Sequence, residues 1–205
     1  MRKLIVNEFV SVDGVAQAPG GQEEDPSGGF AHGGWHMPYA QDELVRAWVM
    51  KYIAEIGALV LGRRTYEIFA GYWPKAPEEN AVAEPLNRLP KHVASTTLTE
   101  PLAWNNSSLL RPDVATAVRA LKQEDGRDLH VIGSAQLVRS LLTDDLVDEL
   151  RLMICPLVLG GGKRIFPEDG QLRRFWLAEH EFTNDGAILA TYSRQREGEA
   201  ARKAA

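Results

Sequence analysis

Short apolar runs alternate along this chain with stretches in which apolar residues recur at helical spacing. Residues 4–12 are rich in Val, Ile and Phe and predict a first strand. Residues 42–56 carry their apolar side chains on one face of a helix, and Gly57 is expected to end it. Residues 58–61 form a continuous apolar run, which is typical of a strand covered on both faces.

The same alternation continues to residue 194. Two late strands, about 175–182 and 187–194, flank Asn184-Asp185-Gly186, and an Asp-Gly turn favours a hairpin. Strands that alternate with helices predict a doubly wound, mostly parallel α/β sheet, to which the hairpin adds antiparallel strands. Further strands are predicted over 92–97, 129–132 and 150–159, and further helices over 66–71, from Pro112 and after Ser134.

One domain is expected over residues 1–194, because 205 residues suit one large domain better than two very small ones. The tail over residues 195–205 is charged and alanine-rich, and we expect it to fray. A glycine-rich loop over residues 15–39 carries Trp35 and His36 near its end. Loops of this length are usually functional or disordered, and its aromatic residues suggest a cover over a ligand.

Three glycine-containing segments each leave the carboxyl end of a predicted strand. They are Gly62-Arg63-Arg64-Thr65, Gly133-Ser134-Ala135-Gln136 and Gly160-Gly161-Gly162. Two of them open helices, whose first amides suit phosphate, while glycine allows close backbone approach. Three such segments in one α/β chain favour a dinucleotide, although no G-x-G-x-x-G follows the first strand.

Five motifs follow one another over about residues 2–193 in an order that resembles the dihydrofolate reductase superfamily. The resemblance is closest to the branch that contains the reductase domain of bacterial riboflavin biosynthesis. It implies an NADPH cofactor, hydride transfer to a pteridine- or pyrimidine-like ring, and a homodimer. The motifs are Ser11-Val12-Asp13-Gly14, the segment 61–67 around Gly62, Ala94-Ser95-Thr96, Val131-Ile132-Gly133-Ser134 and the segment 156–162 that ends in three glycines.

The resemblance also implies roles for single residues. Asp13, the candidate catalytic residue, would lie with Gly14 near the nicotinamide end of the cofactor. Ser95 and Thr96 would lie near the adenosine 2′-phosphate. The remaining predicted cofactor-binding residues would contact the phosphates or approach the cofactor through their backbone; they are Gly62, Arg63, Arg64, Thr65, Gly133, Ser134, Ala135, Gly160, Gly161 and Gly162.

The substrate side departs from the family pattern. Riboflavin-type reductases usually carry a lysine six residues before the aspartate of the Ser-x-Asp-Gly motif, and Asn7 stands there. Asparagine cannot supply the charge that a phosphorylated sugar needs. Asp42 and Glu43 lie near the place of the pterin-binding carboxylate of dihydrofolate reductases, or serve only as first-turn helix residues. Asp13 could equally cap a turn, and His36 is either a proton donor or a loop histidine.

Composition narrows the class of partner. The formal net charge of -5 argues against a nucleic-acid partner. The single cysteine, Cys155, cannot form an internal disulfide and fits a reducing compartment, so we expect a cytoplasmic protein. No apolar stretch approaches the ~18 residues of a membrane span, and the histidines lack metal-ligand spacing. We therefore expect neither a membrane partner nor a metal site.

Together these observations predict an NADPH-dependent reductase that acts on a small heterocycle. Two alternatives remain at this stage. One is the riboflavin-biosynthesis reductase acting on 5-amino-6-(5-phosphoribosylamino)uracil. The other is a nucleotide- or ligand-binding protein that has the same fold and no turnover.

Overall fold

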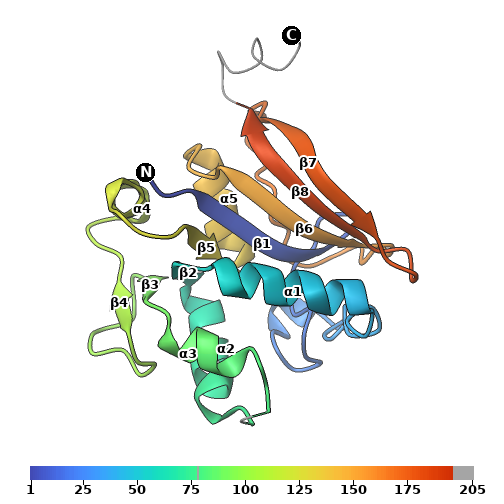
Figure 1. Ribbon diagram of the computed structural model, residues 1–205, viewed down its shortest axis with the longest axis horizontal. Helices are drawn as coiled ribbons and strands as arrows, with labels where there is room; N and C mark the ends of the chain where they lie inside the picture. Colours follow the sequence, from blue (N-terminus) through green and yellow to red (C-terminus); the bar gives the residue numbers. More distant parts are fainter. Residues whose placement is uncertain (78, 196–205) are drawn as a thin grey trace.

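Eight strands form one sheet in the computed structural model, which describes residues 1–77 and 79–195 of the chain (Figure 1). Their order across the sheet is β4-β3-β2-β5-β1-β6-β8-β7. The six strands from β4 to β6 run parallel, whereas β8 pairs antiparallel with both β6 and β7. The strands are β1 (Leu4–Ser11), β2 (Ala58–Gly62), β3 (Lys91–Ala94), β4 (Ser107–Leu109), β5 (Leu129–Val131), β6 (Glu149–Cys155), β7 (Arg174–Phe182) and β8 (Ile188–Gln195).

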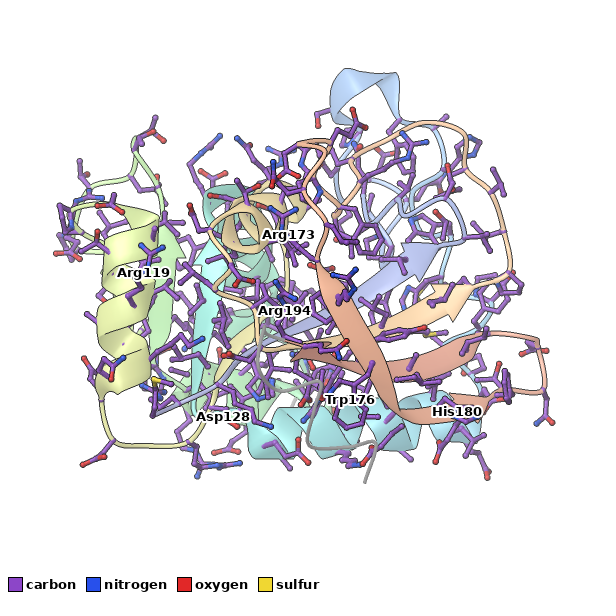
Figure 2. The ribbon with its side chains drawn as sticks, turned by 90° about the horizontal axis from the view of Figure 1, so that it is seen from above. Arg119, Asp128, Arg173, Trp176, His180 and Arg194 are labelled. Atoms are coloured by element: carbon purple, nitrogen blue, oxygen red, sulfur yellow. The ribbon has the colours of Figure 1, made fainter. Side chains whose placement is uncertain are left out.

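Helices cover both faces of this sheet, as Figures 1 and 2 show for α1 on one side and α5 on the other. One apolar cluster joins the sheet to α1, α2 and α3, and another joins it to α4 and α5. Two short 3-10 turns, Ser27–Gly29 and Trp73–Lys75, lie in the connections. The helices are α1 (Glu43–Glu55), α2 (Arg63–Tyr72), α3 (Ala83–Arg88), α4 (Val114–Gln123) and α5 (Ala135–Thr143).

The central strand β1 divides its side chains between the two faces. Leu4, Val6 and Val10 belong to the apolar cluster beneath α4 and α5. Phe9 points to the other face and packs in a cluster that includes Trp48 of α1. Every residue of β2 is buried, because helices cover both of its faces. The alternation in β1 and the continuous apolar run in β2 thus follow from where each strand lies.

The structure confirms the doubly wound, mostly parallel α/β sheet with a C-terminal antiparallel hairpin. The hairpin turn at residues 184–186 holds Gly186 at φ +82°. Predicted boundaries moved by a few residues: α2 begins at Arg63 rather than at residue 66, and β6 ends at Cys155 before Pro156. Pro112 does not open α4, because Asp113 is the N-cap and the helix begins at Val114. Helix α3 lies between α2 and β3, and strand β4 follows β3; the pattern predicted neither of them.

The C-terminal hairpin forms one edge of the sheet, opposite the edge strand β4. Residues of β7 are exposed along almost its whole length, and Figure 2 shows Trp176 and His180 along this strand, far from Arg119 on α4. The expected frayed tail lies outside the described residues from 196 onwards, while Gln195 still belongs to β8. Among the described residues, no helix has both the length and the apolar character that a membrane crossing requires.

The carboxyl ends of β2, β5, β1 and β6 meet at one edge of the sheet, since these neighbouring strands run parallel. In open α/β sheets ligands bind in the crevice beyond this edge. The long loop between β1 and α1 leaves the sheet here, as do the three glycine-containing segments that follow β2, β5 and β6. This edge is therefore the place to examine for a functional site.

Candidate functional site

The segments that follow β2 and β5 touch each other. A Cβ added to Gly62 would lie 2.2 Å from the Ser134 Oγ, and one added to Gly133 would lie 2.6 Å from the Thr65 Oγ1. Gly133 also has φ +71°, which only glycine adopts without strain. The two glycines are required because two helix starts approach each other here without room for a side chain.

The two helices that begin at this contact have uncapped N-termini. The N-cap residues are Gly62 for α2 and Ser134 for α5. Among the described residues, neither position supplies a side-chain oxygen that accepts a hydrogen bond from the first amides of its helix. By contrast, Asp42 caps α1 through the Leu44 amide, and Asp113 caps α4. The first amides of α2 and α5 are therefore open to an external acceptor, and both helix dipoles favour an anion there.

The two predicted phosphate-binding arginines behave differently. Arg63 forms a bidentate ion pair with Glu67 one turn along α2, with both oxygens at 3.0 Å. Arg64 instead lies 3.6 Å from the carboxylate of Asp25 in the long loop. The same carboxylate binds the Nζ of Lys163 at 2.6 Å. Through these two ion pairs, Asp25 links the long loop to the start of α2 and to the segment after the three glycines.

Ser95 and Thr96 follow β3, beside the end of β2, so the sheet brings them to the same edge. The Ser95 Oγ accepts hydrogen bonds from the amides of Thr97 and Leu98, and its carbonyl accepts one from Arg111 at 3.0 Å. Arg111 was not predicted from the sequence. It follows β4, and only the pairing of β3 with β4 brings it next to Ser95.

Asp13 accepts four hydrogen bonds. They come from the Ser11 Oγ at 2.7 Å, from the amides of Leu159 and Gly160 at 3.1 Å each, and from Arg164 at 3.0 Å. The Ser11 hydroxyl is the main cause that lowers the pKa of Asp13 to about 2, with the two amides and Arg164 adding to it. Asp13 therefore fastens the end of β1 to the segment after β6, and its contact with a ligand stays a prediction.

The segment of three glycines is more open than the other two. A Cβ at Gly160 or Gly161 would meet nothing within 4 Å, whereas one at Gly162 would lie 2.8 Å from Val15. Gly14 has φ +78° and packs against Phe166. These glycines join the long loop to the segment after β6, on the far side of β1 from Gly62 and Gly133.

The sequence analysis missed one acid of this site, Glu8. It lies on β1, between the glycines at the starts of α2 and α5 and the glycines that join the long loop to the segment after β6. Glu8 on β1 is 8% exposed, and its Oε1 accepts a hydrogen bond from the Gly133 amide at 2.8 Å. Burial is the main cause that raises the pKa of Glu8 to about 8, and the nearby charge of Glu24 adds to it. The signal was present in the sequence, because Glu8 interrupts the apolar row of Leu4, Val6 and Val10.

The residues that the sequence analysis considered for substrate binding, Asn7, Asp42 and His36, all form contacts within the protein. The Asn7 Nδ2 lies 2.9 Å from the His130 Nδ1, and both side chains are buried. Asp42 caps α1 and also accepts a hydrogen bond from the amide of Asn184. The His36 Nδ1 donates to the carbonyl of Pro19 at 2.7 Å, and its ring stacks on Phe9. Burial lowers the pKa of His36.

Sequence and structure comparisons agree with this geometry. The family model of the RibD C-terminal domain matches residues 2–189. The uncharacterized protein YyaP of Bacillus subtilis (strain 168) is 24% identical over 198 residues, which cover 93% of this chain and 94% of YyaP.

Two solved structures share the fold. A putative riboflavin biosynthesis protein from Shewanella sp. PV-4 has a TM-score of 0.65 at 21% identity, covering 95% of this chain and 99% of its own. Dihydrofolate reductase from Enterococcus faecalis, complexed with NADP(H) and RAB-propyl, has a TM-score of 0.59 at 16% identity, covering 95% and 97%. The expected dihydrofolate-reductase-like fold is confirmed, and the chain belongs to the RibD C-terminal domain family.

Proposed function

We propose that this chain is an NADPH-dependent reductase that transfers hydride to a small pteridine- or pyrimidine-like heterocycle. The observation that carries the proposal is the meeting of two uncapped helix starts at Gly62 and Gly133. A diphosphate needs several amide donors at close range, and these two turns supply them where Gly62 and Gly133 add no side chains of their own. When bound, NADPH supplies the hydride.

Each part of the proposed site has a distinct task. The first amides of α2 and α5 hold the diphosphate, and Thr65 and Ser134 line the same contact. Ser95, Thr96 and Arg111 receive the adenosine 2′-phosphate, which is the feature that separates NADPH from NADH. The long loop, fastened by Asp25, excludes water from the reacting end.

A second candidate is the riboflavin-biosynthesis reductase acting on 5-amino-6-(5-phosphoribosylamino)uracil, which the family match over residues 2–189 favours. Against it, Asn7 stands at the usual lysine position and is occupied with His130. A binding protein without turnover is the remaining alternative. We place the reductase in the cytoplasm, since its one cysteine, Cys155, is buried and unpaired.

The test is a titration of NADPH and NADH against wild type, Arg64→Ala and Arg111→Ala, followed by intrinsic fluorescence. Arg119→Ala, on the exposed surface of α4 (Figure 2), is the matched control. Wild type should prefer NADPH, and losing the charge-assisted contact of Arg111 should weaken NADPH roughly 10- to 100-fold with little effect on NADH. Equal affinity of wild type for the two cofactors would contradict the proposal.

Turnover is measured as NADPH oxidation with a panel of pterins, unphosphorylated pyrimidines and quinones, and separately with 5-amino-6-(5-phosphoribosylamino)uracil. Oxidation with a pterin or pyrimidine supports the reductase. Oxidation only with the phosphoribosylated aminouracil supports the second candidate. Tight NADPH binding without oxidation by any member of the panel supports the binding protein.

A further inference from the structure

The buried acid Glu8 has no evident structural purpose. It occupies a position on β1 where Leu4, Val6 and Val10 on the same face pack in the core beneath α4 and α5. A carboxyl group at such a position is costly unless it is paired. The described residues nevertheless give its side chain one hydrogen bond, from the Gly133 amide to Oε1. No described residue donates a hydrogen bond to the second oxygen, Oε2.

That single bond places the carboxyl group directly under the proposed diphosphate site. Gly133 precedes Ser134, the uncapped N-cap of α5, and its Cα packs against Thr65 of α2. More than nine-tenths of Glu8 is thus buried, and one of its two carboxyl oxygens has no hydrogen-bond partner among the described residues. Its carboxyl group lies where the N-termini of α2 and α5 meet. An ionised carboxylate here would repel the phosphates that the proposed function brings to the same turns.

The charges around Glu8 favour its neutral form. Glu24 of the long loop and Tyr52 of α1 interact with it electrostatically, and the Glu24 charge disfavours ionisation. The cations at this edge already have partners: Arg64 and Lys163 pair with Asp25, Arg63 pairs with Glu67, and Arg164 pairs with Asp13. Arg111 donates to the carbonyl of Ser95. Burial, the largest cause, and Glu24 together raise the pKa of Glu8 to about 8, against the opposing effect of the Gly133 amide.

In the part of the chain that the structure describes, the neighbouring strands and the first turn of α5 place no charged side chain beside Glu8 on its face of the sheet. Arg151 of β6 is in register with Asn7, and His130 of β5 binds Asn7, so both lie on the opposite face of the sheet from Glu8. The first turn of α5 contains Ala135, Gln136 and Leu137 and carries no ionisable side chain.

We propose that Glu8 is a cofactor-binding residue that works in its protonated form, with Oε1 bonded to the Gly133 amide and the hydroxyl on Oε2 offered to the bound nucleotide. This inference rests on the proposed function, because it takes NADPH as the anion held by α2 and α5. Cofactor binding is then coupled to the uptake of one proton whenever Glu8 is ionised in the free protein.

The experiment is calorimetric titration of NADPH from pH 7 to 9.5 in two buffers with different ionisation enthalpies. The range avoids the cofactor's 2′-phosphate, whose second ionisation lies at about pH 6. In wild type the affinity should be constant up to about pH 8 and then fall up to about tenfold per pH unit, with proton uptake approaching one per NADPH. Lys91, whose pKa is lowered to about 8 by burial, lies at the amino end of β3, away from the site.

Two variants test whether Glu8 is the group that takes up the proton when NADPH binds. Glu8→Gln keeps an oxygen for the Gly133 amide and should bind NADPH at pH 7 within about threefold of wild type, with no pH dependence and no proton uptake. Glu24→Gln is the matched control, because Glu24 is a second partly buried acid of the same site, held by the amides of Gly20 and Gly21. It should keep the coupling and move the break to lower pH, because a neighbouring negative charge is removed.

Four outcomes are decisive. Constant NADPH affinity across the range in wild type overturns the role of Glu8 and leaves the proposed function intact. Retention of the pH dependence by Glu8→Gln, or its loss in Glu24→Gln, also overturns it. Absence of NADPH binding at every pH overturns the proposed function and this inference together. If Glu8→Gln does not fold, carbon-13 carboxyl NMR of wild type with and without NADPH decides, since the Glu8 resonance must report the neutral form in the complex at pH 9.

Discussion

Replacing Asp13 by asparagine separates a structural from a catalytic role for the first acid of the site. The carboxylate accepts hydrogen bonds from four donors, and its two oxygens serve the amides of Leu159 and Gly160 separately. An asparagine has one acceptor oxygen, so its NH₂ group must face two of the four donors: the Gly160 amide and Arg164 in one orientation, or the Leu159 amide and the Ser11 hydroxyl in the other. We therefore expect Asp13→Asn to loosen the attachment of the long loop to the segment after β6.

The size of the effect follows from the titration of Asp13. Its pKa is lowered from 3.8 to about 2, mainly by the Ser11 hydroxyl, and this shift corresponds to about 2 kcal/mol in favour of the folded state. Hydrogen bonds to charged groups have the same magnitude, about 1.5–3 kcal/mol. For a chain of 205 residues, a loss of about 2 kcal/mol lowers Tm by roughly 4–8 °C.

The assay is thermal unfolding followed by circular dichroism between pH 7 and pH 3. Because the folded-state pKa is lowered, the contribution of Asp13 is complete above 3.8 and is lost as the pH falls from there towards 2. The difference in Tm between wild type and Asp13→Asn should therefore be constant near neutral pH and shrink below about pH 4. Asp185→Asn, in the exposed hairpin turn, is the control and should change stability by less than about 0.5 kcal/mol.

An unchanged Tm would refute this reasoning. If Asp13→Asn melts like wild type and yet loses NADPH oxidation with a confirmed substrate, Asp13 acts on a ligand, as the sequence resemblance implies. A lower Tm with normal oxidation would remove Asp13 from the catalytic residues and leave it as the fastening between two loops.

Three further outcomes are expected. Gly133→Ala should lose roughly 1–3 kcal/mol and weaken NADPH binding, since φ is +71° and a Cβ would meet Thr65, whereas Gly71→Ala in α2 has open space and should melt at or above the wild-type Tm. Residues 15–39 should gain hydrogen-exchange protection when NADPH binds, while the C-terminal hairpin does not; equal protection in both states would reject a cover. Sedimentation at micromolar concentration should give a homodimer, and Leu177→Lys on exposed β7 tests whether that edge is the interface; a mass near 22.7 kDa for wild type would reject the dimer.

Local patterns predicted most of the fold. Strands β1, β2 and β5 have apolar runs that reflect burial on one face or both, and the helices α1 and α5 have apolar stripes at helical spacing. The hairpin could be predicted from Asp185-Gly186 because turn chemistry is also local. The short elements α3 and β4 could not be predicted, since a six-residue helix carries too little periodicity and the Ser-Ser-Leu sequence of β4 is not an apolar run like that of β5.

The same distinction applies to the site residues: those with a local sequence signal could be predicted, and those that meet only through the fold could not. The glycines of the two helix starts were predicted because a strand followed by glycine and a helix is a local signal. Arg111 was not, because it reaches Ser95 only through the pairing of β3 with β4. Asp13 and Arg164 are 151 positions apart, so their ion pair cannot be predicted from either segment alone. Glu8 is different, since an acid in an apolar row is visible in the sequence itself.

The position of β1 in the sheet constrains how the chain acquires its site during synthesis. This strand emerges from the ribosome ahead of the other seven strands, yet both of its neighbours, β5 and β6, begin more than 120 residues after it begins. Until they emerge, the apolar residues of β1 have no strands to pair with, and neither Glu8 nor Asp13 can meet its partners, Gly133 and Arg164. Pairings so distant in sequence close slowly and leave strand edges exposed meanwhile. A nascent chain that stalls before residue 149 therefore presents β1 unpaired on at least one side, as a target for chaperones or aggregation.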